Sequence, residues 1–306
     1  MQTKQIRKQM LIGLGLAVLL LGGGWRSLRP TPVAAASRAA VLACTNNPIV
    51  TTAADSGAGS LRQAIADACP GSTITFQAGI TMVTLTTAEL LIDKNLTISG
   101  GAGVTVTRQD GSPHFRIFNV AAGIVAFNNL TFSNGLDDIQ GGGGVLSTSA
   151  TFNDCTFTGN AAGQSGALEI NGGTTTLNRC TFNGNSSTLG TVFVFNSNTV
   201  VNATNCILIH DGSYMSTPWN TVFENCICNT TQEWWPLIAS DPHFIDLDGP
   251  DNILGTSDDD FRVAPDSPAI DAGDGTLYLG STKDLLGQSR FSGLGTEPGA
   301  ESPIDI

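Results

Sequence analysis

The chain has 306 residues, and its 26 Asp and Glu outnumber its 14 Lys and Arg, which gives a formal net charge of −12 at pH 7. Contacts to phosphates depend on Lys and Arg, so this balance argues against a nucleic-acid partner. It suits an exported protein or one that binds cations.

In chain order, the first predicted element is a signal peptide. Three basic residues precede the apolar residues 10–21, and Ala34-Ala35-Ala36 follow them. This order is that of a cleaved secretory signal, and the apolar run is shorter than the ~20 residues of a membrane-spanning helix. We therefore expect residues 1–36 to be removed, and the mature chain to be secreted or at the cell surface with no membrane span.

Seven cysteines lie beyond this segment, at positions 44, 69, 155, 180, 206, 226 and 228. An oxidising compartment permits disulfides, and an odd number leaves at least one cysteine unpaired within the chain. Because Cys44 and Cys69 flank the first predicted strand and helix, we predict a disulfide between them that stabilises the fold by ~3 kcal/mol. The cysteine spacing does not match a zinc site.

The stretch of residues 55–76 has the pattern of one short amphipathic helix between strands. Ser60 and Gln63 have the spacing of a capping box, and Pro70-Gly71 ends the pattern. The helical spacing of Leu61, Ala64, Ile65 and Ala68 gives one apolar side and leaves Arg62, Gln63 and Asp67 on the polar side of the helix. We predict a helix over Ser60–Cys69, which is too short to be stable unless it packs on other elements.

A repeated six-residue phrase organises the middle of the chain. Copies begin at Phe127, Phe152 and Leu177, a period of 25 residues, and a further copy at Ala203 follows after 26. A degenerate copy begins at Phe223. Short strands with Gly and Asn turns separate the copies. One such coil cannot bury its own apolar side, so consecutive coils must stack.

Stacking pairs equivalent strands at ~4.8 Å and aligns equivalent side chains in columns. The register predicts two inward columns and an amide ladder, which are Leu130, Cys155, Cys180 and Cys206, then Phe132, Phe157, Phe182 and Leu208, then Asn128, Asn153 and Asn178. We predict an all-β fold, a right-handed parallel β-helix, with coils over residues 77–238. A β-sandwich, the competing fold, lacks a fixed 25-residue register. The inward thiols are expected to be free, since parallel side chains disfavour the disulfide dihedral.

The predicted helix is expected to close the N-terminal end of the stack. The first coil of a solenoid exposes its core and a row of unpaired strand groups. We therefore predict that residues 44–76 form an N-terminal strand and a capping helix. A helix packed on the side of the stack is the alternative.

Three stretches carry a resemblance to a known family. They are DSGAGSLRQAIADACPGSTITF from residue 55, the coil phrases that end in CTFTGN, and DSPAIDAGD with DLLGQSR towards the C-terminus. They resemble bacterial exported right-handed β-helix repeat proteins that are polymorphic outer membrane protein-like and carry a choice-of-anchor type C-terminal region. The resemblance covers about Cys44 to the end and implies a secreted or surface-attached, adhesin-like protein without demonstrated enzymatic activity. Related sequences close with Asp-Ile-Gly-Ala-Tyr-Glu, whereas this chain ends at Asp305-Ile306, so we expect a final strand and any anchor to be missing.

Enzymes also occur on parallel β-helices, so fold alone does not decide activity. Asp137-Asp138 is similar to the paired aspartates of polygalacturonases, but the accompanying Gly-His-Gly and Arg-x-Lys phrases are absent. In a Gly-rich loop the two aspartates are predicted to form a solvated turn. Arg179 is placed on a coil strand one repeat after Asp154, which predicts an ion pair between coils. We predict no catalytic residues, with a polysaccharide lyase as the enzymatic alternative.

Three tryptophans, Trp219, Trp234 and Trp235, follow the last regular coil. Exposed aromatic faces stack on sugar rings, although the same residues would also fill the end of the core. The sequence therefore predicts first an adhesin-like or structural protein, second a polysaccharide-binding module and third a lyase. The expected partner is extracellular, a polysaccharide or a cell surface.

The last predicted segment, residues 239–306, contains an acidic loop. Calcium takes six to eight oxygen ligands and would relieve the repulsion among close carboxylates. We predict calcium as a ligand of Asp246, Asp248, Asp251, Asp258, Asp259 and Asp260. A solvated acidic loop is the alternative.

Overall fold

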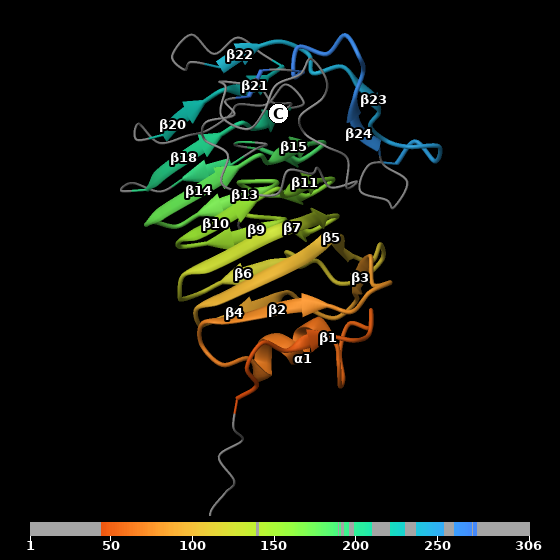
Figure 1. The fold of residues 1–306 in the computed structure, drawn as a ribbon, viewed down its shortest axis with the longest axis vertical. Helices are drawn as coiled ribbons and strands as arrows, with labels where there is room; N and C mark the ends of the chain where they lie inside the picture. The colour runs from red at the N-terminus through yellow and green to blue at the C-terminus, as the bar shows by residue number, and fades with distance from the viewer. Residues whose placement is uncertain are drawn as a thin grey trace, which may run out of the picture. The chain divides into compact units, whose positions relative to one another are not determined.

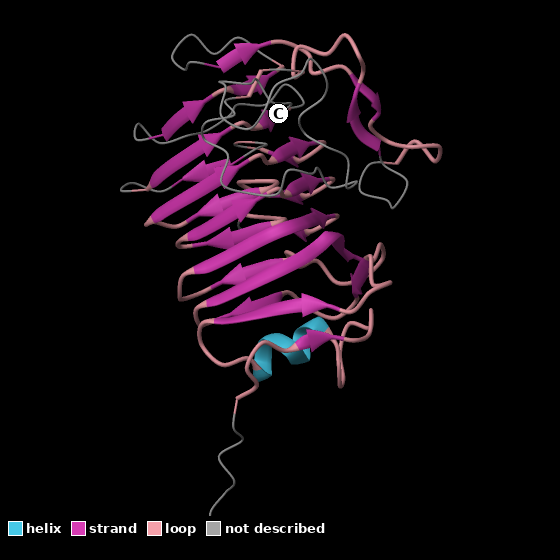
Figure 2. Ribbon diagram, viewed as in Figure 1, coloured by secondary structure: helices cyan, strands magenta, loops and turns pink. Residues whose placement is uncertain are grey.

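Parallel strands stack coil upon coil through most of the structure (Figure 1). The computed structural model describes residues 44–138, 141–188, 190, 193–195, 199–209, 221–229, 237–253, 260–270 and 272–273. Within them the regular structure is almost all β, with a single helix (Figure 2). The predicted parallel β-helix is confirmed, and the predicted signal peptide lies outside the described residues.

Each coil contributes strands to parallel sheets that run along the stack. The large sheet contains β1 (Ile49–Val50), β2 (Ser72–Phe76), β3 (Met82–Leu85), β5 (Leu96–Arg108), β7 (Val125–Ser133), β10 (Ala150–Asn153), β11 (Thr156–Thr158), β14 (Thr174–Asn178), β15 (Thr181–Asn183), β18 (Val200–Thr204), β19 (Ile207–Leu208), β20 (Thr221–Glu224), β21 (Cys226–Cys228) and β22 (Leu237–Ala239). The side sheet contains β4 (Leu90–Ile92), β6 (Phe118–Val120), β9 (Val145–Ser147), β13 (Leu168–Ile170) and β17 (Phe193–Phe195). The corner sheet contains β8 (Leu136–Asp137), β12 (Ala161–Ala162) and β16 (Ser186–Ser187).

The strand register reproduces the 25-residue repeat. Phe152 pairs with Phe127 on one side and with Leu177 on the other. Both predicted inward columns are fully buried, with each side chain at most 1% exposed: Leu130, Cys155, Cys180, Cys206, Phe132, Phe157, Phe182 and Leu208. Equivalent rings stack directly, with the centroids of Phe157 and Phe182 4.5 Å apart. Apolar side chains in identical columns therefore hold the coils together.

The inward cysteines behave as predicted. The thiols of Cys155, Cys180 and Cys206 are free, and each lies near a backbone carbonyl of the preceding coil, as Cys155 Sγ does at 3.4 Å from the Phe127 oxygen. Burial raises the pKa of the Cys180 thiol well above its ordinary value. The three thiols fill the core as small apolar groups.

A bend divides the large-sheet segment of each coil. One residue there adopts a left-handed backbone, with φ between 51° and 55°, at Asn129, Asp154, Arg179, Asn205 and Asn225. Asn and Asp tolerate this region better than other non-glycine residues. Arg179 is the exception, and its guanidinium makes two hydrogen bonds to the Asp154 carboxylate, at 2.8 and 3.0 Å. The predicted ion pair is confirmed, but both residues lie at the bend and not on strands.

The helix α1 (Leu61–Asp67) lies beside β1 and β2 at the N-terminal end of the stack (Figure 1). Its buried residues Leu61, Ala64 and Ile65 join the core of the coils. Ser60 Oγ accepts a hydrogen bond from the Gln63 N–H at 3.2 Å, as a capping residue does. The other half of the predicted capping box does not form, because the Gln63 side chain donates to Asp67. The helix is the N-terminal cap that the repeats require.

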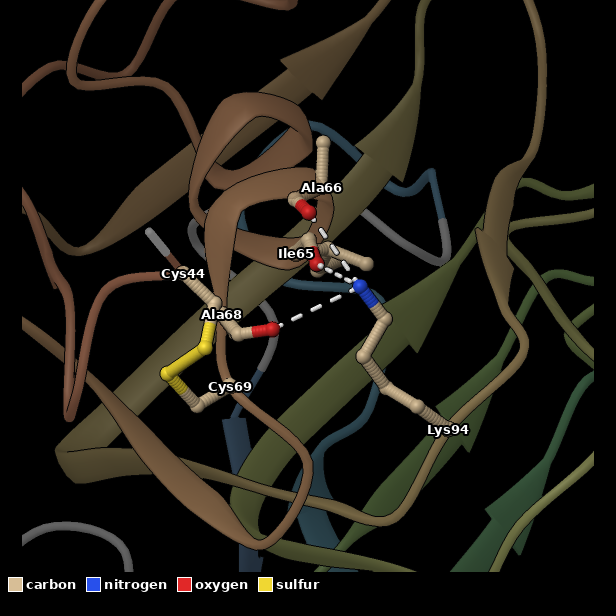
Figure 3. The surroundings of a disulfide bond; sticks show 6 residues. All are labelled: Cys44, Ile65, Ala66, Ala68, Cys69 and Lys94. Atoms are coloured by element: carbon tan, nitrogen blue, oxygen red, sulfur yellow. Dashed lines mark hydrogen bonds between the residues drawn. A yellow bond between two sulfur atoms is a disulfide. The ribbon is translucent and has the colours of Figure 1, made fainter. Parts of the chain in front are cut away.

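Polar contacts tie α1 to the first coils. Lys94 Nζ donates to the carbonyls of Ile65, Ala66 and Ala68 at 3.2–3.5 Å (Figure 3). A cation at this end of a helix is stabilising because the last carbonyls lack partners within the helix. Arg62, predicted on the polar side of the helix, donates to the Glu89 carbonyl at 2.6 Å, so it also anchors the cap.

The predicted disulfide is confirmed. Cys44 and Cys69 are bonded, with their Cα atoms 4.8 Å apart (Figure 3). The bond joins the first described residue to the segment that follows α1. It closes a loop of 25 residues that contains β1 and the helix.

The described C-terminal residues pack on the outside of the large sheet. β23 (Phe244–Asp246) pairs antiparallel with β24 (Asp260–Val263). Ala269, from the SPAIDAG phrase, is fully buried against Ile207 and Ile227, which point outward from β19 and β21. This phrase therefore covers two apolar side chains that face outward from the last coils.

Candidate functional site

The outer side of the large sheet presents two columns of uncharged and mostly polar side chains, which we call the polar face. Its first column is Thr73, Thr97, Ala126, Thr151, Thr176 and Asn202, and its second is Thr75, Ser99, Asn128, Asn153, Asn178 and Thr204. Side chains alternate between the two sides of a strand, so these residues point away from the Phe and Cys columns. All twelve are half-buried or exposed.

The predicted amide ladder is confirmed as the centre of the second column. Asn153 Nδ2 donates to Asn128 Oδ1, and Asn178 Nδ2 donates to Asn153 Oδ1, each at 2.8 Å. An amide nitrogen carries two N–H groups, and these bonds use one from each donor. The second N–H of each half-buried side chain is therefore available to a ligand, in an orientation that the ladder fixes.

Charge is balanced at the border of the polar face. Asp154 and Arg179 follow Asn153 and Asn178 directly at the bend, and their side chains are 7% and 6% exposed. Each neutralises the other, so this border adds no net charge. At the C-terminal end the second column continues from Thr204 to the exposed Glu224.

A second polar group, the Arg116 cluster, lies outside the side sheet and comes from four coils. The Arg116 side chain is 6% exposed, lies 3.0 Å from the Glu89 carboxylate and forms an ion pair with Asp137. It also donates to the Gly141 carbonyl at 3.2 Å. The prediction of a solvated turn is wrong for Asp137, whose side chain is 16% exposed, because this guanidinium draws it against the coil.

Glu169, on the outer side of β13, completes the Arg116 cluster. The residue is 8% exposed, and its Oε2 atom has no hydrogen-bond partner among the described residues. Burial raises the pKa of the Glu169 carboxyl, although the nearby Arg116 opposes this shift. A Cβ on Gly141 would lie 1.6 Å from that oxygen, so a larger residue at this position would displace the Glu169 carboxylate.

The Arg116 cluster contains groups found in acid–base sites, but it serves to hold a loop against the coil. A carboxyl with a raised pKa beside an ion-paired carboxylate is a pattern that acid–base catalysis uses. Here, however, Gly141 packs against Glu169, and burial leaves this carboxyl inaccessible to a polymer. The exposed pair of His114 and Asp138 lies at the edge of the same loop. We therefore assign the cluster to holding the loop and the coil together.

The predicted calcium ligands divide between described and undescribed residues. Asp258 and Asp259 lie outside the described part of the chain, while Asp260 forms an ion pair with Arg262 that lowers its pKa. Asp246 pairs with Asp260 across β23 and β24. Among the residues that the structure describes, no three His, Cys, Asp or Glu side chains are grouped to hold a metal. Calcium binding by the whole set stays a prediction.

The predicted carbohydrate contacts Trp219, Trp234 and Trp235 lie outside the described residues. The first column of the polar face was not predicted, because Thr73 and Thr97 precede the repeated phrase. Aligning the outer positions of every coil would have found it. The Arg116 cluster has no signal in the sequence, since its members come from different positions of different coils.

Comparisons with known proteins do not assign the chain to a family. No protein-family model matches the chain, and no curated protein matches it. In the described portion of the chain, no helix has the length and apolarity to span a bilayer. The chain is a parallel β-helix repeat protein.

Proposed function

We propose that this protein is a secreted or cell-surface β-helix protein with an adhesin-like binding role and no catalytic activity. The observation that carries the proposal is the polar face, an ordered array of hydroxyl and amide groups on a closely packed scaffold. A surface fixed in this way loses little conformational freedom when a partner binds.

The finer proposal is a polymorphic outer membrane protein-like chain with a choice-of-anchor type C-terminal region. Two phrases that carry the resemblance have defined structural roles, which supports it. The phrase at residues 55–76 contains the capping helix, and the SPAIDAG phrase buries Ala269 on the last coils. Export is proposed from the signal-peptide pattern and agrees with the disulfide of Cys44 and Cys69.

A polysaccharide lyase is the enzymatic alternative that we rank below binding. A lyase base must reach the substrate, but the Arg179 guanidinium donates to both Asp154 oxygens and is 6% exposed. Arg116 is equally buried and is engaged by Glu89 and Asp137. Both arginines therefore act as structural ties in our proposal.

The test uses the mature chain, residues 37–306, incubated with a panel of acidic and neutral polysaccharides and with bacterial cell envelopes. We expect retention on at least one of these materials and no new chain ends. New unsaturated ends would show a lyase and overturn the non-catalytic role. Failure to be retained on every material would overturn the binding role.

A further inference from the structure

We infer that the polar face binds a neutral polysaccharide, which lies along the stack and contacts successive coils. This inference rests on the proposed binding role and names the chemistry of its partner. Eleven of the twelve side chains in the two columns carry a hydroxyl or an amide, and Ala126 is the exception.

The side chains of the polar face form a regular grid. Equivalent residues of adjacent coils lie ~4.8 Å apart along the stack, and the two columns are two residues apart along each strand, or ~7 Å. A polymer with hydroxyl groups on every unit meets similar donors and acceptors at each coil. Six coils extend this grid over five strand spacings, or ~24 Å.

The charge of the polar face selects a neutral partner. None of the twelve side chains is charged, in a chain of net charge −12. An acidic polysaccharide would find no Lys or Arg in the two columns, and Arg179, which follows Asn178 at the bend, is neutralised by Asp154. Long-range repulsion from the acidic chain also disfavours polyanions.

The polar side chains are held before any ligand arrives. The amide ladder fixes the side chains of Asn128, Asn153 and Asn178, and Thr side chains are stiff at χ1 because they are β-branched. Binding therefore orders few side chains, which reduces its entropic cost. Because each contact is weak, affinity should rise with the length of the sugar chain until the six coils are covered.

The experiment measures retention of the mature chain on insoluble neutral glucans and its affinity for soluble neutral gluco-oligosaccharides of increasing length. Polygalacturonate is the acidic comparison. We expect retention on a neutral glucan, affinity that rises with length, and weaker retention on polygalacturonate. Thr151→Glu should weaken glucan binding roughly ten-fold or more, because it places a charge and an unpaired carboxylate in the first column.

Two further variants keep the test decisive. Leu91→Glu adds the same charge at an exposed, outward position of β4 in the side sheet and should bind like the parent. Thr176→Ala removes a hydroxyl without adding charge and should weaken binding by a smaller factor. Glucan binding that both Thr variants leave unchanged would overturn the inference, as would retention on polygalacturonate alone. The latter result would leave the proposed binding role intact.

Discussion

The two sides of the large sheet differ in what their repeated columns contain. The inner side stacks Phe and Cys in fully buried columns, whereas the outer side stacks Thr and Asn in half-buried ones. One backbone register aligns both sets, because neighbouring residues of a strand point to opposite sides. The comparison shows how a single repeat supplies a packed core on one side and, on the other, the polar face that we propose as a binding surface.

The inner side should show the largest effect on stability. Phe157 is fully buried, and its ring centroid lies 4.8 Å from that of Phe132 and 4.5 Å from that of Phe182. Phe157→Ala should lower the free energy of unfolding by ~3–5 kcal/mol, since it removes both contacts and leaves a cavity. Chemical denaturation of the mature chain measures this change. A loss below ~1 kcal/mol would contradict the role assigned to the column.

The N-terminal cap extends the comparison to the end of the stack. Removing the disulfide with the pair of changes Cys44→Ala and Cys69→Ala should cost ~3 kcal/mol, because the bond restricts the unfolded chain. Peptide mapping without reduction should recover the two cysteines as one linked peptide in the parent. Separate free-thiol peptides there would show that the bond is absent.

The Arg116 cluster should make stability depend on pH. The pKa of Glu169 is raised in the folded protein, so the folded state holds this proton more tightly than the unfolded chain does. Its contribution therefore becomes unfavourable as pH rises from the ordinary value of 4.5 through the raised pKa. Burial is the largest cause of the raised pKa of Glu169, Arg116 opposes it, and Asp137 adds to it.

Glu169→Gln removes this ionisation and keeps the shape of the side chain. We expect the variant to be more stable than the parent at pH 7 and to lose this advantage below pH 4.5. Melting temperatures of both proteins across this range provide the measurement. Curves that run parallel at every pH would mean that Glu169 does not titrate abnormally.

The smallest expected effect concerns calcium and the acidic loop. If the loop binds the ion in the folded state, millimolar calcium should raise the melting temperature over that in chelator by roughly 2–4 °C for each ~1 kcal/mol of stabilisation. The paired changes Asp246→Asn and Asp248→Asn should abolish the shift. Identical melting temperatures of the parent in both buffers would end the calcium proposal.

The structural features that depend on the repeat could be predicted from the sequence. A repeat of 25 to 26 residues fixes which side chains align, so the inward columns, the amide ladder and the ion pair of Asp154 and Arg179 could be derived. The capping helix followed from the need to close a solenoid. These features depend on local pattern and on register alone.

Contacts between different positions of different coils could not be derived. Asp137 was predicted to be solvated because its neighbours in sequence are glycines, yet Arg116 from the preceding coil buries it. Arg62 was placed on the polar side of the helix by periodicity, but the Glu89 carbonyl lies within its reach. Long arginine side chains reach partners whose positions cannot be predicted from the periodicity of a helix or a strand.

Neighbouring residues of β10 allow the most direct test of the central claim, which is that the outer side binds and the inner side stabilises. Thr151 points outward to the polar face, and Phe152 is fully buried against Phe127. The measurement is the melting temperature and the affinity for a neutral glucan of Thr151→Glu and Phe152→Leu. The account predicts that Thr151→Glu loses affinity and melts close to the parent, while Phe152→Leu melts lower and binds like the parent. Equal losses of both properties in both variants would contradict it.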